Sequence, residues 1–546
     1  MYSLAVVITL IPYICLAILG LRYYTHMLQL SSYQFQGYFR FLKSNIARDI
    51  FHVLFLILLL PVFFADFEDP LVPALMMLGA VGIFTGLVIS YIPRQAKKKF
   101  VVTDRVKRLF VTYIVLFLVA VIIIPLLIPV SGQGDDHVIA KTVVIITAGT
   151  LYVGLLPLVT ALANLINKPV EQRINRYYID DAKRMLSENK NLRIIGITGS
   201  YGKTSVKYYL TTLLSEKYSV LMTPESYNTP MGVVRTIREH LKPTHEIFVC
   251  EMGARHLHDI KEITDIVNPD DGILTSIGPQ HLETFHSIDN IISTKYELLD
   301  AVDEKEKSQG KEEGKHLKFV NGDNEIIRNN MKYSDAITYG VSEGCDFRAT
   351  DIKVDSSGTT FRVTTPSGES DEFSTRLVGE HNVQNIVGAI AASYSLGVPL
   401  NKLRMGVRRL QSVPHRLELN KHGNVAILDD AYNSNPTGAK VALDTLALFD
   451  GSVKILVTPG MVELGEKEEE YNKEFGKQAA AVCDYIILVG EKNSPAIKAG
   501  ALEAGFDAEK IFVKDNLNQA TALMYEIDAG REKVILLEND LPDNYK

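Results

Sequence analysis

A glycine loop at residues 198–204 constrains the fold of this chain more than any other part of its sequence. The loop reads Thr198, Gly199, Ser200, Tyr201, Gly202, Lys203, Thr204, and it lies between an apolar strand pattern at 193–197 and a helical pattern at 205–217. Strand, loop and helix in this order direct backbone N–H groups and a helix N-terminus at a phosphate chain. Lys203 is then expected at the outer phosphates and the Thr204 hydroxyl at Mg²⁺. The pattern predicts an open α/β domain that binds a nucleotide, although Ile197 replaces the first glycine of GxxxxGK[ST].

The first 166 residues are much more apolar than the rest of the 546-residue chain. About 20 helical residues cross a bilayer core of about 30 Å, and several apolar runs approach that length. The five runs lie at 4–21, 50–65, 71–91, 109–130 and 138–166. Pro61 in the second run, and Lys141 and Pro157 in the fifth, leave a buried soluble helix as the alternative for either run alone. Because the runs follow one another, we expect a transmembrane helical domain over 1–166, followed by a linker over 167–190.

The charges between these runs predict an orientation. Lys and Arg occur in the segments after the first and third runs, at 22–48 and 94–108, whereas the other two loops carry Asp and Glu without Lys or Arg. By the positive-inside rule the basic segments face the cytoplasm, which places the chain after Ile166 inside. The first run lacks a basic leader and a small-residue cleavage site, so we expect it to be retained. We therefore expect a multi-pass protein of the cell membrane with its ligand-binding domains in the cytoplasm.

Net charge and cysteine spacing argue against a nucleic-acid-binding protein, a cysteine metal site and a disulfide-bonded protein. The formal net charge of −7 offers no basic surface for nucleic acid. The four cysteines, Cys15, Cys250, Cys345 and Cys483, lack the spacing of metal ligands. We expect none of them in a disulfide, because scattered thiols are typical of a reducing compartment.

Several short motifs follow the glycine loop. They read Asn228-Thr-Pro-Met-Gly232, Glu251-Met-Gly-Ala254, Gly278-Pro-Gln-His-Leu-Glu283, Thr294-Lys-Tyr-Glu-Leu298, Gly379-Glu-His-Asn-Val-Gln-Asn385 and Gly460-Met-Val-Glu-Leu-Gly465. Their identity and order resemble the Mur ligases, which add amino acids or dipeptides to cell-wall precursors. The motifs are most similar to the branch that adds D-alanyl-D-alanine, and the similarity extends over about residues 194–490.

The resemblance implies a role for individual residues. At the nucleotide it places Thr198, Gly199, Ser200, Tyr201, Gly202, Lys203, Thr204, Asn382, Asn385, Arg416 and Asp430, with the asparagines at the adenine and Asp430 at the ribose. At Mg²⁺ it places Thr204, Glu251 and His281. In catalysis it places Lys203, Lys295, His281 and Arg416, with Arg416 at the γ-phosphate or the acyl phosphate. Lys295 matches a lysine that several Mur ligases carbamylate.

Each of these residues also has an ordinary structural interpretation. A carboxylate at a strand end, such as Glu251, is often solvated or capping, and His281 alone would be a hydrogen-bonded loop histidine. Lys295 would be an exposed helix lysine, and an asparagine at a helix start is a common cap. The carboxyl ends of parallel strands bind ligands in open α/β sheets, and Mg²⁺ prefers oxygen ligands, which favours a functional role for Glu251.

We expect a Mur ligase central ATP-binding domain over 191–411 and a Rossmann-like C-terminal domain over 412–546. In the second domain, apolar runs at 453–458, 485–489 and 534–537 alternate with helical patterns. The chain departs from the resemblance at two places. It ends in Glu538-Asn-Asp540 and a short tail where the D-alanyl-D-alanine branch tends to have Gly-Ser-Arg. The small soluble domain that binds the UDP-sugar has no counterpart, and the apolar segment occupies its place.

The resemblance implies an ATP- and Mg²⁺-dependent ligase that forms an amide bond through an acyl phosphate in cell-wall peptide synthesis. Its partners would be a muramoyl-peptide or lipid-linked wall precursor, an amino acid or a dipeptide, and membrane lipid, with no nucleic acid. A poly-γ-glutamate-type synthetase is the enzymatic alternative, and a membrane scaffold with a relic nucleotide domain is the non-enzymatic one. A relic would have lost some of these side chains, whereas the sequence retains every residue named for catalysis and metal binding.

Overall fold

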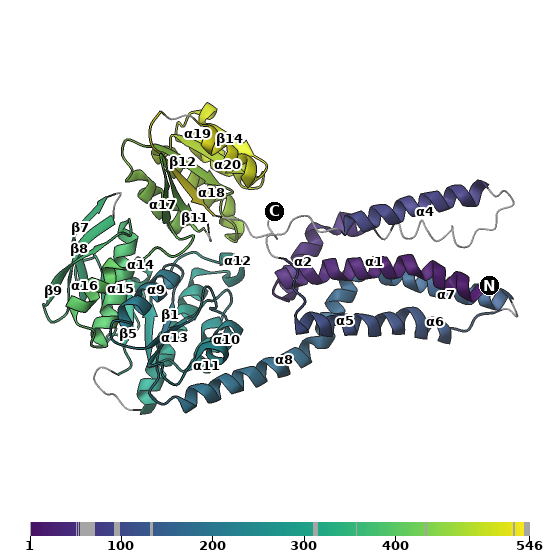
Figure 1. The fold of residues 1–546 in the computed structure, drawn as a ribbon, viewed down its shortest axis with the longest axis horizontal. Coiled ribbons are helices and arrows are strands. Elements are labelled where there is room, and N and C mark those ends of the chain that lie inside the picture. The colour runs from purple at the N-terminus through teal and green to yellow at the C-terminus, as the bar shows by residue number, and fades with distance from the viewer. Residues whose placement is uncertain are drawn as a thin grey trace. The chain divides into compact units, whose positions relative to one another are not determined.

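The computed structural model describes residues 2–50, 52, 54, 71–91, 99–131, 135–309, 315–355, 358–431, 434–527 and 530–539. The chain divides into two compact units, one within 1–176 and one within 177–541 (Figure 1). Helix α8, Leu156–Glu188, contains this boundary. The sequence-based limit at Ile166 therefore lies inside a continuous helix.

The N-terminal unit is helical. Its elements are α1 (Tyr2–Leu30), α2 (Phe35–Ser44), α4 (Leu71–Ser90), α5 (Asp104–Phe117), the π-helical segment η1 (Leu118–Ile123), α6 (Ile124–Leu127), α7 (Asp135–Gly154) and the first part of α8. Thr103 fixes the start of α5, because its hydroxyl accepts a hydrogen bond from the Val106 N–H. Side chains from several helices, including Leu21, Tyr38, Leu109 and Tyr152, form one buried apolar core.

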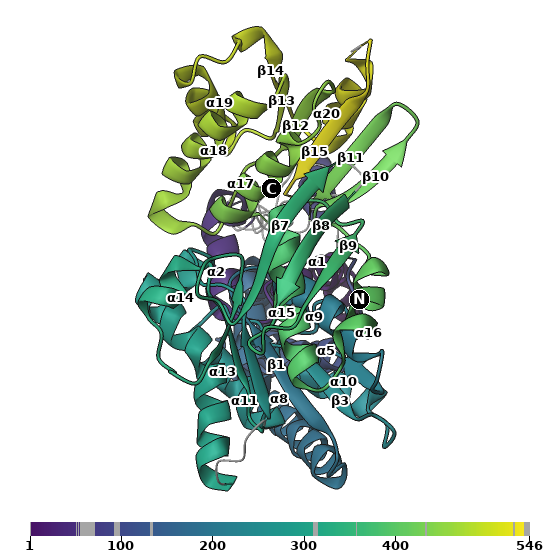
Figure 2. The same ribbon diagram turned by 90° about the vertical axis from the view of Figure 1, so that its left-hand side faces the viewer.

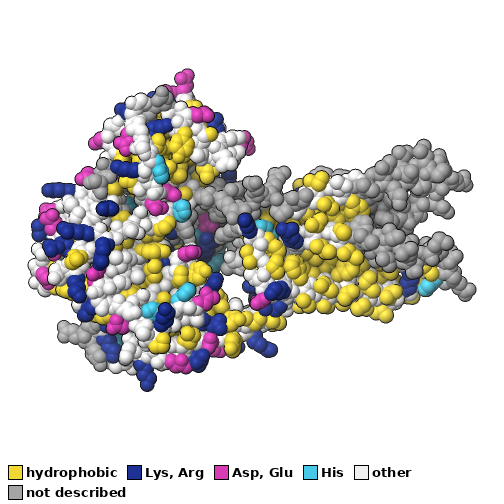
Figure 3. Space-filling view, in the orientation of Figure 1, with side chains coloured by type: hydrophobic (Ala, Val, Ile, Leu, Met, Phe, Trp, Pro, Cys, Tyr) yellow, Lys and Arg dark blue, Asp and Glu magenta, His cyan; other side chains and the backbone are white. Residues whose placement is uncertain are grey.

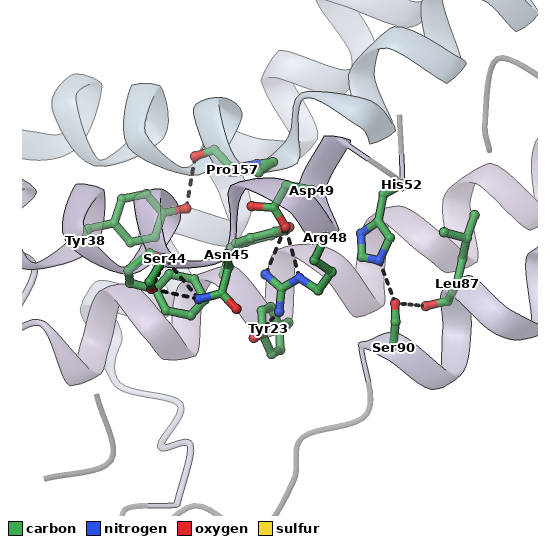
Figure 4. A network of polar contacts seen from close by, with 12 residues as sticks. Tyr23, Tyr38, Ser44, Asn45, Arg48, Asp49, His52, Leu87, Ser90 and Pro157 are labelled. Carbon is green, nitrogen blue, oxygen red and sulfur yellow. Dashed lines mark hydrogen bonds and ion pairs between the residues drawn. The ribbon is translucent and has the colours of Figure 1, made fainter. Parts of the chain in front are cut away.

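A polar network lies among these helices (Figure 4). The Asp49 carboxylate accepts hydrogen bonds from the Tyr24 hydroxyl at 2.9 Å and from the Arg48 guanidinium at 2.9 and 3.0 Å. Arg48 also donates to the Tyr23 hydroxyl at 2.6 Å. The partly buried charged pair thus has hydrogen-bond partners within the helices, which compensate for its removal from water.

The expectation of five membrane-spanning helices is wrong. Among the described residues, one unbroken helix, Asp104–Leu127, is long and apolar enough to cross a membrane, and a core helix of a soluble protein can meet the same criteria. The fifth run covers parts of two helices, Ala140–Gly154 and Leu156–Glu188, which qualify only as a pair and make an angle of 78° at their junction. Most of the second run, 50–65, and the basic residues at 94–98 lie outside the described residues.

The same finding corrects the predicted location, because the described residues do not support a multi-pass membrane protein. The physical reason is that apolar length does not distinguish between burial against lipid and burial against other helices. Leu16, Leu87, Leu109 and Tyr152, which lie in four different runs, are buried in one common core. The core therefore accounts for part of the apolar character that suggested membrane spans.

Some large apolar side chains of this unit are exposed. They include Val111 and Ile114 on α5, Leu118 at the start of η1, and Leu158 and Leu162 on α8. Figure 3 shows apolar side chains over much of the described surface of this unit.

The larger unit contains a nine-stranded sheet in the order β2-β3-β1-β4-β5-β6-β7-β8-β9. Its strands are β1 (Arg193–Thr198), β2 (Val220–Met222), β3 (Ile247–Glu251), β4 (Asp271–Leu274), β5 (Lys318–Asn321), β6 (Ile337–Gly340), β7 (Phe347–Asp355), β8 (Gly358–Thr364) and β9 (Ser370–Thr375). Pairing is parallel from β2 to β7 and antiparallel from β7 to β9. Because β1 lies between two parallel strands, its apolar residues are buried, as a central strand requires.

Helices cover both faces of this sheet (Figure 1). They are α9 (Lys203–Leu214), α10 (Pro230–His240), α11 (Asp259–Val267), α12 (Leu282–Phe285), α13 (Ile288–Gln309), α14 (Glu325–Asn329), α15 (Glu380–Ser395) and α16 (Leu400–Arg408). Apolar side chains of α9, α15 and α16 pack in one core, and those of α10, α11 and α13 pack in the other. This arrangement confirms the predicted open α/β sheet.

A second sheet follows in the order β10-β11-β15-β12-β13-β14 (Figure 2). Its elements are β10 (Glu418–His422), β11 (Val425–Asp430), α17 (Pro436–Ala447), β12 (Val453–Thr458), η2 (Gly465–Lys467), α18 (Glu468–Val482), β13 (Tyr485–Val489), α19 (Ser494–Glu503), η3 (Ala508–Lys510), β14 (Ile511–Lys514), α20 (Leu517–Glu526) and β15 (Lys533–Glu538). All pairs except β10–β11 are parallel. The three apolar runs predicted as strands are β12, β13 and β15, which confirms the α/β character of this region.

Lys318 on β5 allows a test of the stability of the larger unit. Its side chain is 1% exposed, and its ammonium lies 2.8 Å from Glu306 and 2.9 Å from Asp335. Lys318→Met leaves the buried Glu306 carboxylate without its cation, so we expect the free energy of unfolding to fall by about 3 kcal/mol. Lys332→Met, which removes a more exposed ion pair, should lower it by less than about 1 kcal/mol. Urea denaturation followed by circular dichroism measures both changes, and equal losses would contradict this account.

Candidate active site

The glycine loop connects the end of β1 to the start of α9, as predicted. Gly202 precedes the helix with a φ of +77°, and a Cβ there would lie 2.5 Å from Asn385 Oδ1. Gly199 has a φ of +151°, and a Cβ there would collide with the Thr275 hydroxyl. Both glycines are therefore required by backbone conformation and by close packing against neighbouring elements.

Side chains and backbone groups that follow β3 and β4 hold the loop in place. The Ser200 N–H donates to the Ser276 carbonyl oxygen at 2.8 Å, and the Tyr201 N–H donates to the Ser276 hydroxyl at 2.7 Å. The Thr198 hydroxyl donates to the Met252 carbonyl oxygen at 3.0 Å. The side chain of Ser200 is hydrogen-bonded to Gly278. The polar groups of Thr198 and Ser200 thus stabilise the shape of the loop.

Lys203, the first residue of α9, turns back over the loop. Its Nζ donates to the Gly199 carbonyl oxygen at 2.7 Å and to that of Ser200 at 3.3 Å. Burial lowers the pKa of Lys203 to about 8, Glu251 partly opposes this shift, and Arg416 adds to it. The ammonium therefore lies against the backbone of the glycine loop, where we expect the phosphates to bind.

Glu251 lies at the carboxyl end of β3 and is 1% exposed. Its Oε1 accepts hydrogen bonds from the Thr204 hydroxyl at 3.1 Å and from Asn228 Nδ2 at 3.0 Å. Its Oε2 lies 3.0 Å from Lys207 Nζ. Burial alone would raise the pKa of this carboxyl, but the charges of Lys207 and Lys203 outweigh burial and hold it below its usual value. The site thus contains a buried, ionised carboxylate in contact with the Thr204 hydroxyl.

Lys207 was missed by the sequence reasoning, and Asn228 was noted only as part of a motif. The available signal for Lys207 was its spacing, because residues four apart lie on the same face of a helix. Nothing in the sequence indicated that Asn228 would reach Glu251, since the two residues are joined only by the fold.

His281 precedes α12 in a left-handed conformation, with a φ of +54°. Its Nδ1 lies 2.6 Å from Glu463 Oε2, and the other oxygen of Glu463 lies 3.6 Å from Arg255 Nη1. Burial lowers the pKa of His281, although Glu463 opposes the shift, so the imidazole is neutral near pH 7. The contact with Glu463 was also missed, although that residue lies in the Gly-x-Met-x-Glu-Leu-Gly motif.

Lys295 lies on α13 and is 2% exposed, so the interpretation as an exposed helix lysine does not apply. Burial and the charge of Lys203 lower its pKa well below the usual value. Its ammonium donates no hydrogen bond to any of the described residues. This environment therefore favours the neutral, nucleophilic amine of Lys295 over the charged ammonium.

The two asparagines predicted at the adenine lie in different environments. Asn382 is buried, its Oδ1 accepts from the Tyr209 hydroxyl at 2.8 Å, and its Nδ2 donates to the Val378 carbonyl oxygen at 2.9 Å. Its amide therefore links α15 to α9. Asn385 Oδ1 lies beside Gly202 in the glycine loop.

Arg416 and Asp430 lie at the second sheet. Asp430 ends β11, accepts a hydrogen bond from the Leu417 N–H at 3.2 Å and pairs in register with Glu538 of β15. Burial raises the pKa of Asp430 to about 6, although Arg416 opposes the shift. Burial and Asp430 raise the pKa of Glu538 well above its usual value, and the Ser434 hydroxyl donates to its Oε1 at 2.5 Å. The sequence reasoning gave Glu538 no role in the site.

The structure thus brings Lys203, Thr204 and Glu251 together. Among the described residues, no three His, Cys, Asp or Glu side chains are grouped to hold a metal ion. Two protein oxygens, from Glu251 and Thr204, nevertheless suit Mg²⁺, which binds few protein ligands and completes its shell with phosphate oxygens and water. The chemistry of these residues therefore fits a magnesium–nucleotide complex.

Comparison with known families gives two matches. Residues 197–393 match the Mur ligase middle domain, and residues 415–538 match the Mur ligase glutamate ligase domain. Together the matches cover more than half of the chain. They include every predicted site residue.

Individual relatives agree with this result. The UDP-N-acetylmuramoyl-tripeptide--D-alanyl-D-alanine ligase of Bacillus subtilis is 33% identical over 364 residues, which are 64% of this chain and 76% of the relative. The enzyme of the same name from Escherichia coli is 30% identical over 355 residues, covering 62% and 75%.

Solved structures show the same relationship. A crystal structure of MurF from Acinetobacter baumannii matches with a TM-score of 0.59 and 26% identity, over 68% of this chain and 78% of that one. MurF of Thermotoga maritima in complex with ADP matches with a TM-score of 0.58 and 25% identity, over 67% and 80%. The motifs, the two α/β sheets and these similarities together show that the chain belongs to the Mur ligase family of ATP-dependent ligases.

Proposed function

We propose that this chain adds D-alanyl-D-alanine to a UDP-muramoyl-tripeptide in peptidoglycan synthesis, with ATP and Mg²⁺. The names of the Bacillus subtilis and Escherichia coli relatives support this choice of substrates. The observation that carries the chemistry is the ionised Glu251 in contact with the Thr204 hydroxyl beside the glycine loop. A lipid-linked precursor and a poly-γ-glutamate-type reaction have no comparable support.

The proposed reaction has two steps. A carboxylate oxygen of the tripeptide forms a bond to the γ-phosphorus of ATP as the bond to ADP breaks, which yields an acyl phosphate. The amine of D-alanyl-D-alanine then attacks the acyl carbon, releases phosphate and loses a proton. Positioning and electrostatic stabilisation suffice for such a transfer, and no covalent protein nucleophile is needed.

Several residues of this chain would hold the reactants. Lys203 would contact the outer phosphates, and Arg416 would balance charge on the transferred phosphoryl group, for which a guanidinium is well suited. Glu251 and Thr204 would hold Mg²⁺, which when bound neutralises charge on the phosphate oxygens. His281 could join the metal only through Nε2, because its Nδ1 faces Glu463.

The remaining nucleotide contacts are proposals based on position. Asn385 lies beside the glycine loop and is the better placed of the two asparagines, since the amide of Asn382 is occupied by protein groups. Asp430 would contact the ribose from the end of β11. We propose domain boundaries at 191–411 and 412–546, which contain the two matched segments.

Lys203→Ala tests the assignment. Wild-type protein should release phosphate only when ATP, Mg²⁺, UDP-muramoyl-tripeptide and D-alanyl-D-alanine are all present. The substitution removes a cation from the phosphate site, so we expect the rate to fall by about 10²-fold or more. Lys473→Ala, which breaks an exposed ion pair with Glu503, should retain the wild-type rate. Near-normal turnover by Lys203→Ala, or wild-type turnover only with another amine, would contradict the proposal.

We also propose that Lys295 is carbamylated, because its lowered pKa favours the neutral amine that reacts with CO₂. Protein incubated with ¹³C-bicarbonate should show a carbamate carbon by NMR that is missing in Lys295→Arg. Lys305→Arg, which alters a lysine on the same helix, should retain the signal. Identical spectra for wild type and Lys295→Arg would refute the modification.

The pKa of Lys203 predicts how nucleotide binding depends on pH. Below about pH 8 the ammonium is charged in the free protein, and above it the proton is lost, so phosphate binding should weaken as pH rises. We expect the affinity for MgADP to fall by up to about tenfold per pH unit above this value. Isothermal titration calorimetry between about pH 6.5 and 9.5 measures the change, with Lys203→Arg as the variant that should remove it. Constant wild-type affinity over this range would disprove the assignment.

A further inference from the structure

Glu463 lies between β12 and η2 of the second sheet region, and the proposed reaction gives it no task. Its Oε2 lies 2.6 Å from Nδ1 of His281, which precedes α12 beside the first sheet, and its Oε1 lies 3.6 Å from Arg255 Nη1. Glu463 and His281 are 182 residues apart and belong to the two segments that match different Mur ligase domains. The contact therefore joins these segments at a proposed metal ligand.

The backbone is constrained on both sides of this contact. The φ angle is +54° at His281 and +65° at Glu463, which is the left-handed region. Residues other than glycine occupy this region at a cost and remain there where the surrounding structure holds them. The two backbones also approach closely, because a Cβ on Gly465 would lie 3.8 Å from the Cα of Glu283. The positions of His281 and Glu463 are thus fixed by their surroundings.

The hydrogen bond determines which imidazole nitrogen carries the proton. An ionised carboxylate can only accept a hydrogen bond, so Nδ1 of a neutral His281 must be the protonated nitrogen. Nε2 then has a lone pair, and within the described part of the chain it has no hydrogen-bond partner. Histidine in water prefers the proton on Nε2. The contact with Glu463 therefore reverses the usual preference.

We infer that Glu463 is a positioning residue, which holds His281 in the Nδ1–H tautomer and so directs the Nε2 lone pair to the metal ion. A carboxylate that accepts from the other nitrogen of a metal-binding histidine orients the ring and makes it a stronger ligand. Because Glu463 belongs to the second matched segment, His281 is held in this way only while the two α/β regions are in contact. The inference rests on the proposed function, because it takes His281 as a metal ligand.

The first test determines the tautomer of His281 by ¹⁵N NMR of full-length protein labelled at histidine. Spectra at about pH 8 report neutral imidazoles, since the usual histidine pKa is about 6.5, and His281→Gln assigns the resonance. We expect the Nδ1–H tautomer in wild type. Glu463→Gln keeps the size of the side chain, but its amide can also donate, so Nε2–H should become the major form, as in water. Arg255→Met, which removes another partner of Glu463, should retain Nδ1–H.

The second test measures binding of Mn²⁺, as a substitute for Mg²⁺, to the protein with ADP by electron paramagnetic resonance. Glu463→Gln should weaken Mn²⁺ binding about tenfold, because Nε2 is no longer held as an acceptor. In a His281→Gln background, the same substitution should have no further effect, since Glu463 acts through His281. This comparison separates the positioning of His281 from the loss of a negative charge and from a weaker contact between the two α/β regions.

Four results would overturn the inference. They are an Nε2–H tautomer in wild type, an unchanged tautomer in Glu463→Gln, unchanged Mn²⁺ binding in that variant, and equal weakening with and without His281. The wild-type spectrum decides the first of these without any substitution. Neither measurement needs peptide substrate or phosphate release. Absent phosphate release in wild type would therefore refute the ligase reaction, while the tautomer and the Mn²⁺ affinities would still decide the role of Glu463.

Discussion

The charge of Glu251 at the end of β3 organises the surroundings of the glycine loop. Because this carboxylate is buried, it remains ionised only through the cations and donors around it. Lys207 and Thr204 come from α9, and Asn228 comes from the loop before α10. A strand, a helix and a loop are thus held at one point by a single charged group. The same arrangement leaves an oxygen next to the Thr204 hydroxyl, where the chemistry of the site needs a metal ligand.

Contacts from the region of the second sheet complete this arrangement. Glu463 accepts a hydrogen bond from His281, and Arg416 is near enough to lower the pKa of Lys203. The pair formed by Asp430 and Glu538 lies at the carboxyl ends of neighbouring strands. Burial and the proximity of the two carboxyls raise the pKa of both Asp430 and Glu538, because two buried neighbouring carboxyls disfavour a second negative charge.

The N-terminal unit shows where apolar pattern is an ambiguous signal. The apolar runs correctly predicted helices there, but their length alone was not sufficient to identify membrane spans. In the structure, the fifth run is divided between two helices that meet at a sharp bend, and residues from several runs pack in a shared core. The polar network around Arg48 and Asp49 also depends on the packing of helices, and no motif in the sequence indicated it.

The sequence by itself determined the glycine loop, the parallel strands that surround it and the family to which the chain belongs. These features are local or periodic, so residue order and hydrophobic spacing suffice to predict them. It also placed Lys203, Thr204 and Glu251 in one site, because the carboxyl ends of parallel strands meet at one edge of a sheet. Only the tertiary structure decided which partner each side chain has. Lys207 with Glu251, Asn382 with Tyr209, and His281 with Glu463 are separated by 44 to 182 residues, and such contacts arise from how helices and loops pack around a sheet.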